Sequence, residues 1–293
     1  MEYLMTYGWA ILIIAVVLGV LYYLGIFNSA NLAPRLQPGS CHVARTAAGV
    51  QNFGVCSGLP EFVATLYGYG GMVYTSNSIE TTGPITGIAA GGQTNAMTIT
   101  AWVKPSSAQS IATQGPGVFS TVGYGMNLGD QVNHIWLDAC GASSEAFAIS
   151  GANLADGGWH FVYISYNYSS NTVLAGIDGQ GVSAGVAGPI SITANTPVYI
   201  GAEHSCGPSS SLPWRGFNGS IANVQFYNAS LSQVEITALY KEGIGGAPIK
   251  PAAAVGWWPL NGDTNDYSGN NNNAQATDVQ YTNTWLSSYS GPS

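Results

Sequence analysis

The first hydrophobic segment of the chain runs from Tyr3 to Phe27 and contains no charged residue. As an α-helix its 25 residues would extend about 37 Å, enough to cross a hydrocarbon core of about 30 Å. Trp9 lies near one end, and Tyr22 and Tyr23 near the other, where aromatic rings favour the membrane–water boundary. A cleaved secretory signal fits less well, because no positive segment precedes the apolar run and no small-residue cleavage site follows it. The pattern predicts a transmembrane helix within residues 1–28.

Residues 29–60 are polar and are interrupted by Pro34, Pro38, Gly39 and Gly58, so we expect a linker there. From Glu61 the hydrophobic period becomes two. Residues 62–66 and 72–75 flank a Gly-rich turn and predict a hairpin, and residues 97–103 alternate cleanly. Further strands are expected at 118–124, 132–138, 145–149, 159–166, 172–177, 189–193, 197–202 and 220–227.

Short strands at this spacing predict an all-β sandwich or barrel over residues 61–293. One helix interrupts them: Ser232 and Glu235 form a capping box, and Gly243 suits the C-terminal cap. A strand at 255–260, a loop at 261–270 and a last strand around 279–281 follow.

Composition narrows the function classes. Only 7% of residues are charged, the net charge is −8, and six residues are Lys or Arg. A nucleic-acid groove needs a basic patch, so nucleic acid is excluded as a partner. The richness in Gly and in neutral polar residues is typical of an exported β domain, which we expect outside the cell with the helix in the membrane. Three sequons predict glycosylation at Asn167, Asn218 and Asn228.

Four cysteines in such a chain predict disulfides. Of three connectivities the simplest joins Cys41 to Cys56 and Cys140 to Cys206. A loop of about 15 residues closed in this way would stabilise the fold by about 3 kcal/mol. A metal site is the less favoured alternative, because CxxC spacing is missing.

The first 27 residues, which begin MEYLMTYGWAILIIA, resemble the N-terminal helix of archaeal type IV pilin-like proteins with a class III signal peptide. The resemblance implies that Glu2 neutralises a neighbouring subunit's terminal amine when the helices bundle into a filament. Glu2 would alternatively remain at the wet interface, where it also favours the positive end of the helix dipole. In that family a peptidase removes a basic leader; here we expect either a processed or trimmed form, or a start codon placed too late.

The β region resembles a LamG-like, concanavalin A-like jelly roll over roughly residues 60–285. The motifs, in order, are MTITAWVKP, GGWHFVYISYN, IDGQG and FNGSIANVQFYNASLSQVEITALYKEGIGGAP. VGWWPLNGDTNDYSGNNNN resembles the opening strand of that family but comes last here. Either residues 255–285 close the same sandwich or they begin a second domain. We favour closure, because a fragment of two strands could not bury its face.

The loop after residue 260 carries oxygen ligands in a pattern that suits calcium. They are Asp263, Asn265, Asp266, Ser268 and Asn270. The resemblance implies calcium held by this loop and by an acidic pair on the strand after F-x-G-x-I, but that pair is Ala222-Asn223 here. The alternative is a loop of Asx-turns that bonds its own backbone.

Signals of catalysis are weak. Residues 181–185, GVSAG, match a nucleophile pattern, but it falls in a run of turn residues between strands rather than on a strand–turn–helix elbow. The Glu-x-Asp-x-x-Glu run of retaining glycosidases in this fold is missing, and His42, His134, His160 and His204 lack metal-ligand spacing. We expect no enzyme.

Sugar binding would use exposed aromatics, for which the candidates are Trp136, Trp214, Trp257 and Tyr124, whereas Trp102, Trp159 and Trp258 are assigned to packing. The sequence therefore predicts a membrane-anchored surface protein that recognises a glycan or a surface-protein ligand. The alternatives are a filament subunit without a ligand and a degenerate glycoside hydrolase.

Overall fold

The computed structural model describes most of the 293-residue chain, namely residues 13, 16, 41–44, 53–56, 59–68, 75–86, 93–94, 96–106, 115–121, 123–139, 145–185, 190–191, 196–204 and 213–292. The chain divides into two compact units, Met1–Gln37 and Pro38–Ser293. In the first unit only Ile13 and Val16 are described, and both are helical; the rest of the predicted transmembrane helix, with Glu2, lies outside the described residues. Within the described ranges, no helix is both long and apolar enough to span a bilayer.

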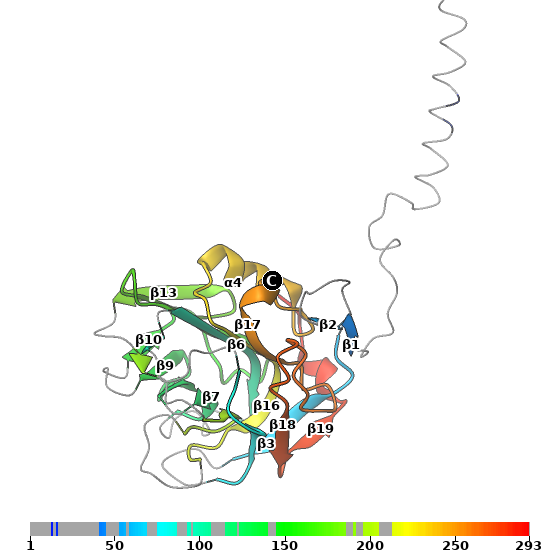
Figure 1. The fold of residues 1–293 in the computed structure, drawn as a ribbon, viewed down its shortest axis with the longest axis horizontal. Coiled ribbons are helices and arrows are strands. Elements are labelled where there is room, and N and C mark those ends of the chain that lie inside the picture. The colour runs from blue at the N-terminus through cyan, green and yellow to red at the C-terminus, as the bar shows by residue number, and fades with distance from the viewer. Residues whose placement is uncertain are drawn as a thin grey trace, which may run out of the picture. The chain divides into compact units, whose positions relative to one another are not determined.

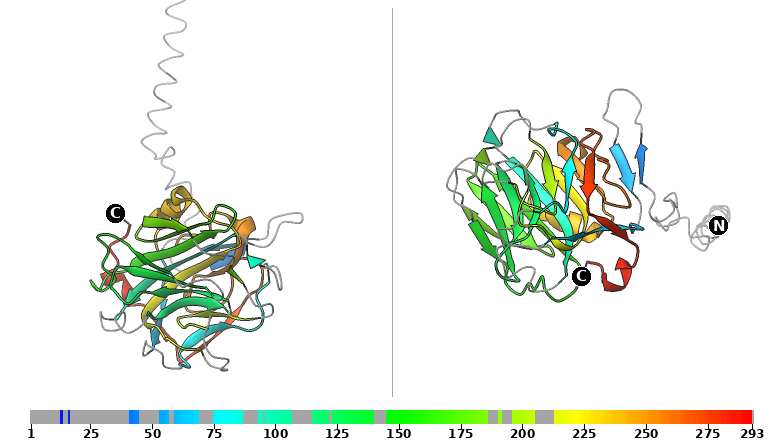
Figure 2. Two further views of the ribbon diagram at one scale, coloured as in Figure 1. Left: turned by 90° about the vertical axis from the view of Figure 1, so that its left-hand side faces the viewer. Right: turned by 90° about the horizontal axis from the view of Figure 1, so that it is seen from below.

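The second unit is a sandwich of two antiparallel sheets, which Figure 1 and Figure 2 show packed face to face. The first sheet has seven strands, in the order β10 (Glu145–Ala148), β9 (His134–Ala139), β8 (Tyr124–Leu128), β7 (Gly117–Thr121), β15 (Val198–Ile200), β4 (Ser78–Thr81) and β18 (Ala274–Thr277). The prediction of an all-β jelly-roll sandwich is confirmed.

The second sheet has eight strands, in the order β13 (Gln180–Gly185), β12 (Thr172–Ile177), β11 (His160–Asn167), β6 (Ala96–Pro105), β16 (Asn218–Tyr227), β3 (Val63–Tyr67) and β19 (Gln280–Thr282), with β17 (Ala254–Trp258) also paired to β16. Two small sheets accompany these, formed by β1 (Cys41–Ala44) with β2 (Phe53–Cys56) and by β5 (Gln93–Thr94) with β14 (Ile190–Ser191).

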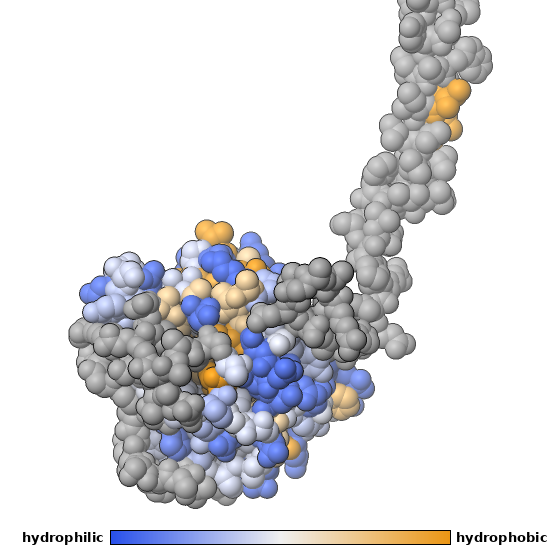
Figure 3. Space-filling view, in the orientation of Figure 1, coloured by the Kyte–Doolittle hydropathy of each residue, from blue (hydrophilic) through white to orange (hydrophobic). Residues whose placement is uncertain are grey.

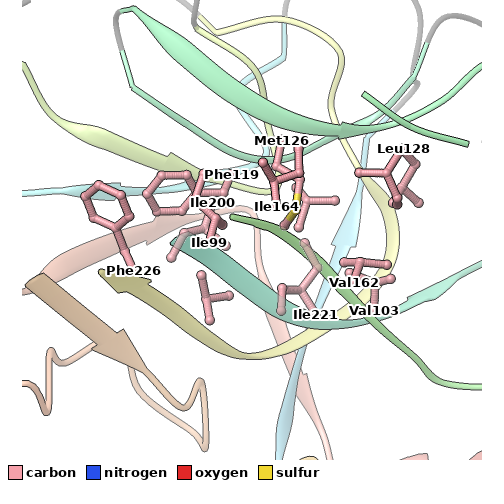
Figure 4. Packing of buried hydrophobic residues seen from close by; sticks show 14 of the residues in the cluster. Ile99, Val103, Phe119, Met126, Leu128, Val162, Ile164, Ile200, Ile221 and Phe226 are labelled. Carbon is pink, nitrogen blue, oxygen red and sulfur yellow. The ribbon is translucent and has the colours of Figure 1, made fainter. Parts of the chain in front are cut away.

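The main core lies between the two sheets (Figure 4). Alternate residues of β6, such as Ile99 and Val103, point into it, because successive side chains of a strand face opposite sides. Phe119 and Phe226 meet across the layer with ring centroids 5.1 Å apart. The seven-stranded sheet contributes Phe119, Met126, Leu128 and Ile200, and the eight-stranded sheet contributes Ile99, Val103, Val162, Ile164, Ile221 and Phe226.

The outer face of the eight-stranded sheet is buried as well, beneath α4 (Gln233–Glu242) and the 3₁₀ turns η1 (Pro251–Ala253) and η2 (Trp285–Ser288). The predicted capping box is present, since the Ser232 side chain accepts from the backbone N–H of Glu235 and the Glu235 side chain accepts from the backbone N–H of Ser232. Tyr240 of α4 stacks on Trp102 of β6 at 5.8 Å. Because both faces of this sheet are covered, its central strands are apolar on both sides.

The C-terminal segment supplies strands to both sheets. β17 pairs with β16, β18 pairs with β4 and β19 pairs with β3. Asn261 then ties this segment to the start of the domain, because its Oδ1 accepts a 2.8 Å hydrogen bond from the backbone N–H of Phe62.

One local prediction is wrong, and another falls partly outside the described residues. The predicted hairpin of residues 62–66 and 72–75 includes residues 72–74, which the structure does not describe; the described strand β3 pairs with β16 and β19. The 181–185 motif is not a turn between strands but lies inside β13, which pairs with β12. Gly181 is required by packing, because a Cβ there would lie 2.2 Å from the Tyr163 hydroxyl.

The first two cysteines are directly opposite each other in β1 and β2. Opposed residues in an antiparallel pair have Cα atoms about 4.5–5.5 Å apart, within the range that a disulfide requires. The Cys41–Cys56 bridge stays a prediction that this register supports. Cys140 and Cys206 lie outside the described residues.

Candidate functional site

The face of the seven-stranded sheet that points away from the core is polar. Met126 and Leu137 pair across β8 and β9 and point inward. Their neighbours therefore point outward, and they include Asn127 opposite Trp136 and Asp138 opposite Gly125. We call this outward side the polar face.

A buried ionic cluster lies on the polar face. The Glu203 side chain is fully buried, and its Oε2 accepts a 3.0 Å hydrogen bond from Asn127 Nδ2 and a 2.6 Å bond from Arg215 Nη1. The same Nη1 lies 3.6 Å from Asp138 Oδ2. Two carboxylates and one guanidinium therefore share the site, which we call the Glu203–Arg215 cluster.

The backbone after β15 positions this cluster. Glu203 and Trp214 form an isolated β-bridge with two reciprocal N–H···O bonds of 2.8 Å. The next residue, Arg215, has φ of 49°, a left-handed conformation that costs a residue with a Cβ free energy and is common at functional sites. The guanidinium then lies over the Trp214 ring, with Cζ 4.7 Å from the ring centroid.

Several polar atoms of this region are buried without a partner in the described structure. They are the acceptor Asn127 Oδ1 and the donors Arg215 Nε, Trp136 Nε1 and Trp214 Nε1. Such an atom costs about 1–3 kcal/mol when nothing pairs with it. Trp136 and Trp214 are partly exposed as residues, so the region combines partly exposed aromatic residues with unused hydrogen-bonding capacity.

The polar face continues across β15 and β4. Tyr199 stacks on His204 with ring centroids 4.9 Å apart, and its hydroxyl donates to Glu80 Oε1 at 3.1 Å. Burial, and then the neighbouring Glu80 carboxylate, raise the pKa of the Tyr199 hydroxyl well above its usual range. Tyr199 is therefore a neutral donor at physiological pH.

The predicted calcium loop is organised around Asp266. Its Oδ1 accepts from the backbone N–H groups of Trp257 at 2.9 Å and Ser268 at 2.8 Å, and its Oδ2 accepts from Ser268 Oγ at 2.8 Å and the Asn272 N–H at 2.9 Å. Four donors fill the positions at which a carboxylate accepts. The Asp266 carboxylate in this arrangement is therefore used within the loop itself.

The other proposed ligands of that loop are engaged too. Asp263 accepts from Asn265 and from the Tyr267 hydroxyl, while Asn270 Nδ2 donates to Ser268 Oγ at 3.1 Å. Among the described residues, no group of three His, Cys, Asp or Glu side chains could hold a metal ion. Calcium stays a prediction from the sequence alone.

The remaining candidates are spread over the domain. Of the three sequon asparagines, Asn228 is exposed and the other two are partly buried. The proposed sugar platforms Trp257 and Tyr124 are wrong, because both are completely buried; Trp136 and Trp214 alone of the four aromatics are partly exposed.

The histidines whose side chains the structure describes form no metal-binding group. His134 bonds Asp130, His204 lies on the polar face, and the side chain of His42 is not described. His160 forms two ion pairs: its Nδ1 lies 2.7 Å from Asp178 Oδ2, and its Nε2 lies 3.0 Å from Asp156 Oδ1.

Sequence reasoning missed three members of the Glu203–Arg215 cluster: Asn127, Asp138 and Arg215. One signal was available for Arg215, which is the only Lys or Arg between Lys104 and Lys241 and directly follows a tryptophan. No local pattern marks Asn127 or Asp138, because strand register alone brings them to the site.

Residues 77–237 match the model of the concanavalin A-like lectin/glucanases superfamily. A native heptameric SAP-like pentraxin from Limulus polyphemus has a similar fold, with a TM-score of 0.54 and 13% identity over 76% of this chain and 94% of that one. A putative carbohydrate binding protein from Bacteroides ovatus gives 0.54 and 11% over 84% of this chain and 70% of that one. No curated protein sequence matches this chain significantly. The family model spans more than half of the chain and the sandwich agrees with it, so the chain belongs to the concanavalin A-like lectin/glucanases superfamily.

Proposed function

We propose that the β domain binds a glycan on the polar face and that the protein acts in recognition or adhesion at the cell surface. The observation that carries the proposal is the joint presence of two partly exposed tryptophans and four buried polar atoms without a described partner. Binding sites typically combine aromatic surface with a few placed polar groups. The descriptions of the superfamily and of the Bacteroides ovatus protein support the same class of ligand.

Exposed apolar surface is limited on the described residues of the β domain. On the side of the β domain in Figure 3, hydrophobic residues form small patches among hydrophilic ones. The most exposed large apolar side chain of the described domain is Val234 on α4, at 80%. A single exposed side chain of this kind needs no partner to explain it.

Binding can be tested with the full chain in detergent on a glycan array, followed by calorimetry on the strongest hit. Trp136→Ala and Trp214→Ala should each weaken binding at least about tenfold, as is typical of aromatic anchors. Tyr168→Ala is the matched control, because Tyr168 is an exposed aromatic in the turn between β11 and β12 of the other sheet. No glycan binding, or binding that both tryptophan variants retain, would contradict the proposal.

The N-terminal segment is proposed to anchor the domain in the membrane, with the β domain outside, or to bundle into a filament. Its uncharged 25-residue run and the resemblance to pilin-like helices support this. Electron microscopy of material sheared from expressing cells separates the two outcomes. Filaments lost on Glu2→Ala would support bundling, whereas chain found only in detergent-extracted membranes would support a single anchor.

A further inference from the structure

We propose that Asn228 is the N-glycosylation acceptor of the folded β domain and that the fold closes the other two sequons, at Asn167 and Asn218. All three have the Asn-x-Ser pattern, so their residue types do not distinguish them. Strand pairing and hydrogen bonding do. The proposal does not rest on glycan binding at the polar face, which belongs to the other sheet.

N-glycosylation joins a sugar to the side-chain amide of an asparagine. The amide nitrogen attacks the anomeric carbon of an oligosaccharide carried on a polyprenyl phosphate or diphosphate. The new N–C bond forms as the C–O bond to the phosphate breaks, the lipid phosphate leaves with the electron pair, and one amide proton is lost. The acceptor segment must enter the transferase as a single strand, so a sequon inside a sheet can react only when the sheet opens.

The Asn218 sequon lies inside the eight-stranded sheet. It forms the first three residues of β16, which pairs with β3 on one side and with β6 on the other. The carbonyl of Asn218 accepts from the Ser106 N–H at 3.0 Å, and Ser220 Oγ lies within hydrogen-bonding distance of Thr65 Oγ1, at 3.1 Å. Presentation of this sequon would require β16 to leave both of its neighbours.

The Asn167 sequon is closed by its own side chain as well as by the sheet. Asn167 is the last residue of β11 and pairs with Thr172 of β12 and Ala96 of β6. Its Oδ1 accepts from the Ser170 N–H at 3.3 Å, and its Nδ2 donates to Ser230 Oγ at 3.2 Å. The nitrogen that would have to attack the sugar is therefore already a donor within the fold.

Asn228 lies beyond the paired part of its strand. The pairing of β16 ends at Tyr227, and Asn228 follows in a bend as an exposed residue. Its backbone N–H donates to the Ala253 carbonyl at 3.0 Å. Among the three sequon asparagines, Asn228 alone combines exposure with a position outside a strand.

The contacts that hold the Asn228 sequon are local. Thr98 Oγ1 donates to the Ala229 carbonyl at 2.8 Å, and Ser230 Oγ, the hydroxyl of this sequon, accepts from Asn167 Nδ2. The two sequons therefore contact each other. Release of these bonds frees a short loop and leaves the strand pairs of β16 in place, so we expect this segment to open more readily than either of the others.

The test uses the purified full chain in detergent, an oligosaccharyltransferase and a lipid-linked oligosaccharide. The same reaction is run on a proteolytic digest whose peptides retain the three sequons, and mass spectrometry measures the rate of transfer to each asparagine. The ratio of the rate in the folded chain to the rate in the digest removes the intrinsic preference of each sequon. We expect this ratio to be at least about tenfold higher for Asn228 than for the other two, since a closed segment reacts in proportion to its open population.

Hydroxyl variants confirm the assignment. Ser230→Ala removes the hydroxyl of the Asn228 sequon and should abolish transfer to the folded chain. Ser169→Ala and Ser220→Ala are the matched controls, because they disable the Asn167 and Asn218 sequons and should leave the amount transferred unchanged.

The rate ratios in the unmodified chain need no variant, so they stand even where a substitution impairs folding. Ratios that are equal at the three sites, or higher at Asn167 or Asn218, would overturn the proposal. Failure of Asn228 to accept a glycan, in the folded chain or in the digest, would overturn it as well. None of these outcomes alters the case for glycan binding on the polar face.

Discussion

Replacement of Asp266 by Asn tests whether the loop after β17 is held by its own hydrogen bonds. Asp266 is 8% exposed, and its carboxylate accepts four hydrogen bonds. An Asn side chain keeps one oxygen for two of these donors and turns an NH₂ group toward the others. The Ser268 hydroxyl can reverse its role, but the Asn272 N–H cannot, so one buried donor loses its acceptor.

The loss can be estimated from these contacts. A buried donor without a partner costs about 1–3 kcal/mol, and the charge lost from the remaining bonds adds about 1 kcal/mol. We therefore expect Asp266→Asn to destabilise the domain by about 2–4 kcal/mol. For a domain of this size that corresponds to a fall in Tm of roughly 4–16 °C.

Differential scanning calorimetry of the two proteins, in EDTA and in millimolar calcium, measures both effects. The control is Asp263→Asn, because Asp263 is only partly buried and its loss should shift Tm by less than about 2 °C. Calcium should leave the Tm of the unmodified protein unchanged. A Tm that Asp266→Asn does not alter, or a calcium-dependent rise that this variant abolishes, would refute the reasoning.

Three further predictions concern other parts of the domain. The pKa of His160 is raised, because burial lowers it but the carboxylates of Asp178 and Asp156 raise it more. The protonated His160 should therefore stabilise the fold fully below the ordinary histidine pKa of 6.5, and this stabilisation should be lost as pH rises through the higher pKa of the folded state. Thermal unfolding between pH 6 and 9 should therefore show a fall in Tm that His160→Gln flattens. Gly201→Ala should destabilise the domain by about 1–3 kcal/mol in a urea titration, because the added Cβ would lie 2.2 Å from a methyl group of Leu66. Gly151→Ala is the control: its φ is similarly positive but nothing lies within 4 Å of the added Cβ, so it measures the backbone strain alone. The full chain should release no reducing sugar from polysaccharides, and turnover that Glu203→Gln abolishes would contradict a purely binding role.

The elements that the sequence predicts well are those whose signal is local. The alternation of Ile99 and Val103 with polar neighbours identifies β6, and the pairing of Ser232 with Glu235 identifies the start of α4. The missed elements depend on distant partners. β13 is rich in Gly and is recognisable as a strand only through its pairing with β12, and both partners of β3 lie more than 150 residues away in the sequence.

The candidate site was predictable only in part, for the same reason. Trp136 and Trp214 can be predicted as candidate sugar-binding residues from their residue type, but the pairing of the strands decides whether they are exposed. Asn127 reaches Glu203 across 76 residues of sequence, and the Arg215 side chain is aimed by a positive φ that no sequence rule assigns to arginine. Clusters assembled by strand register therefore remain hidden until the sheet order is known.

The placement of the last three strands has a consequence for synthesis. β18 and β19 pair with β4 and β3, so the first and last strands of the sandwich meet, and Phe62 bonds a residue 199 positions later. Contacts of such sequence separation make folding slow. While β17 to β19 are still being made, β3 and β4 have one unpaired edge each, and unpaired edges invite association with other chains. The sandwich can therefore close only after β18 and β19 have been synthesised, and a nascent chain of this protein depends on protection of those two edges until these strands arrive.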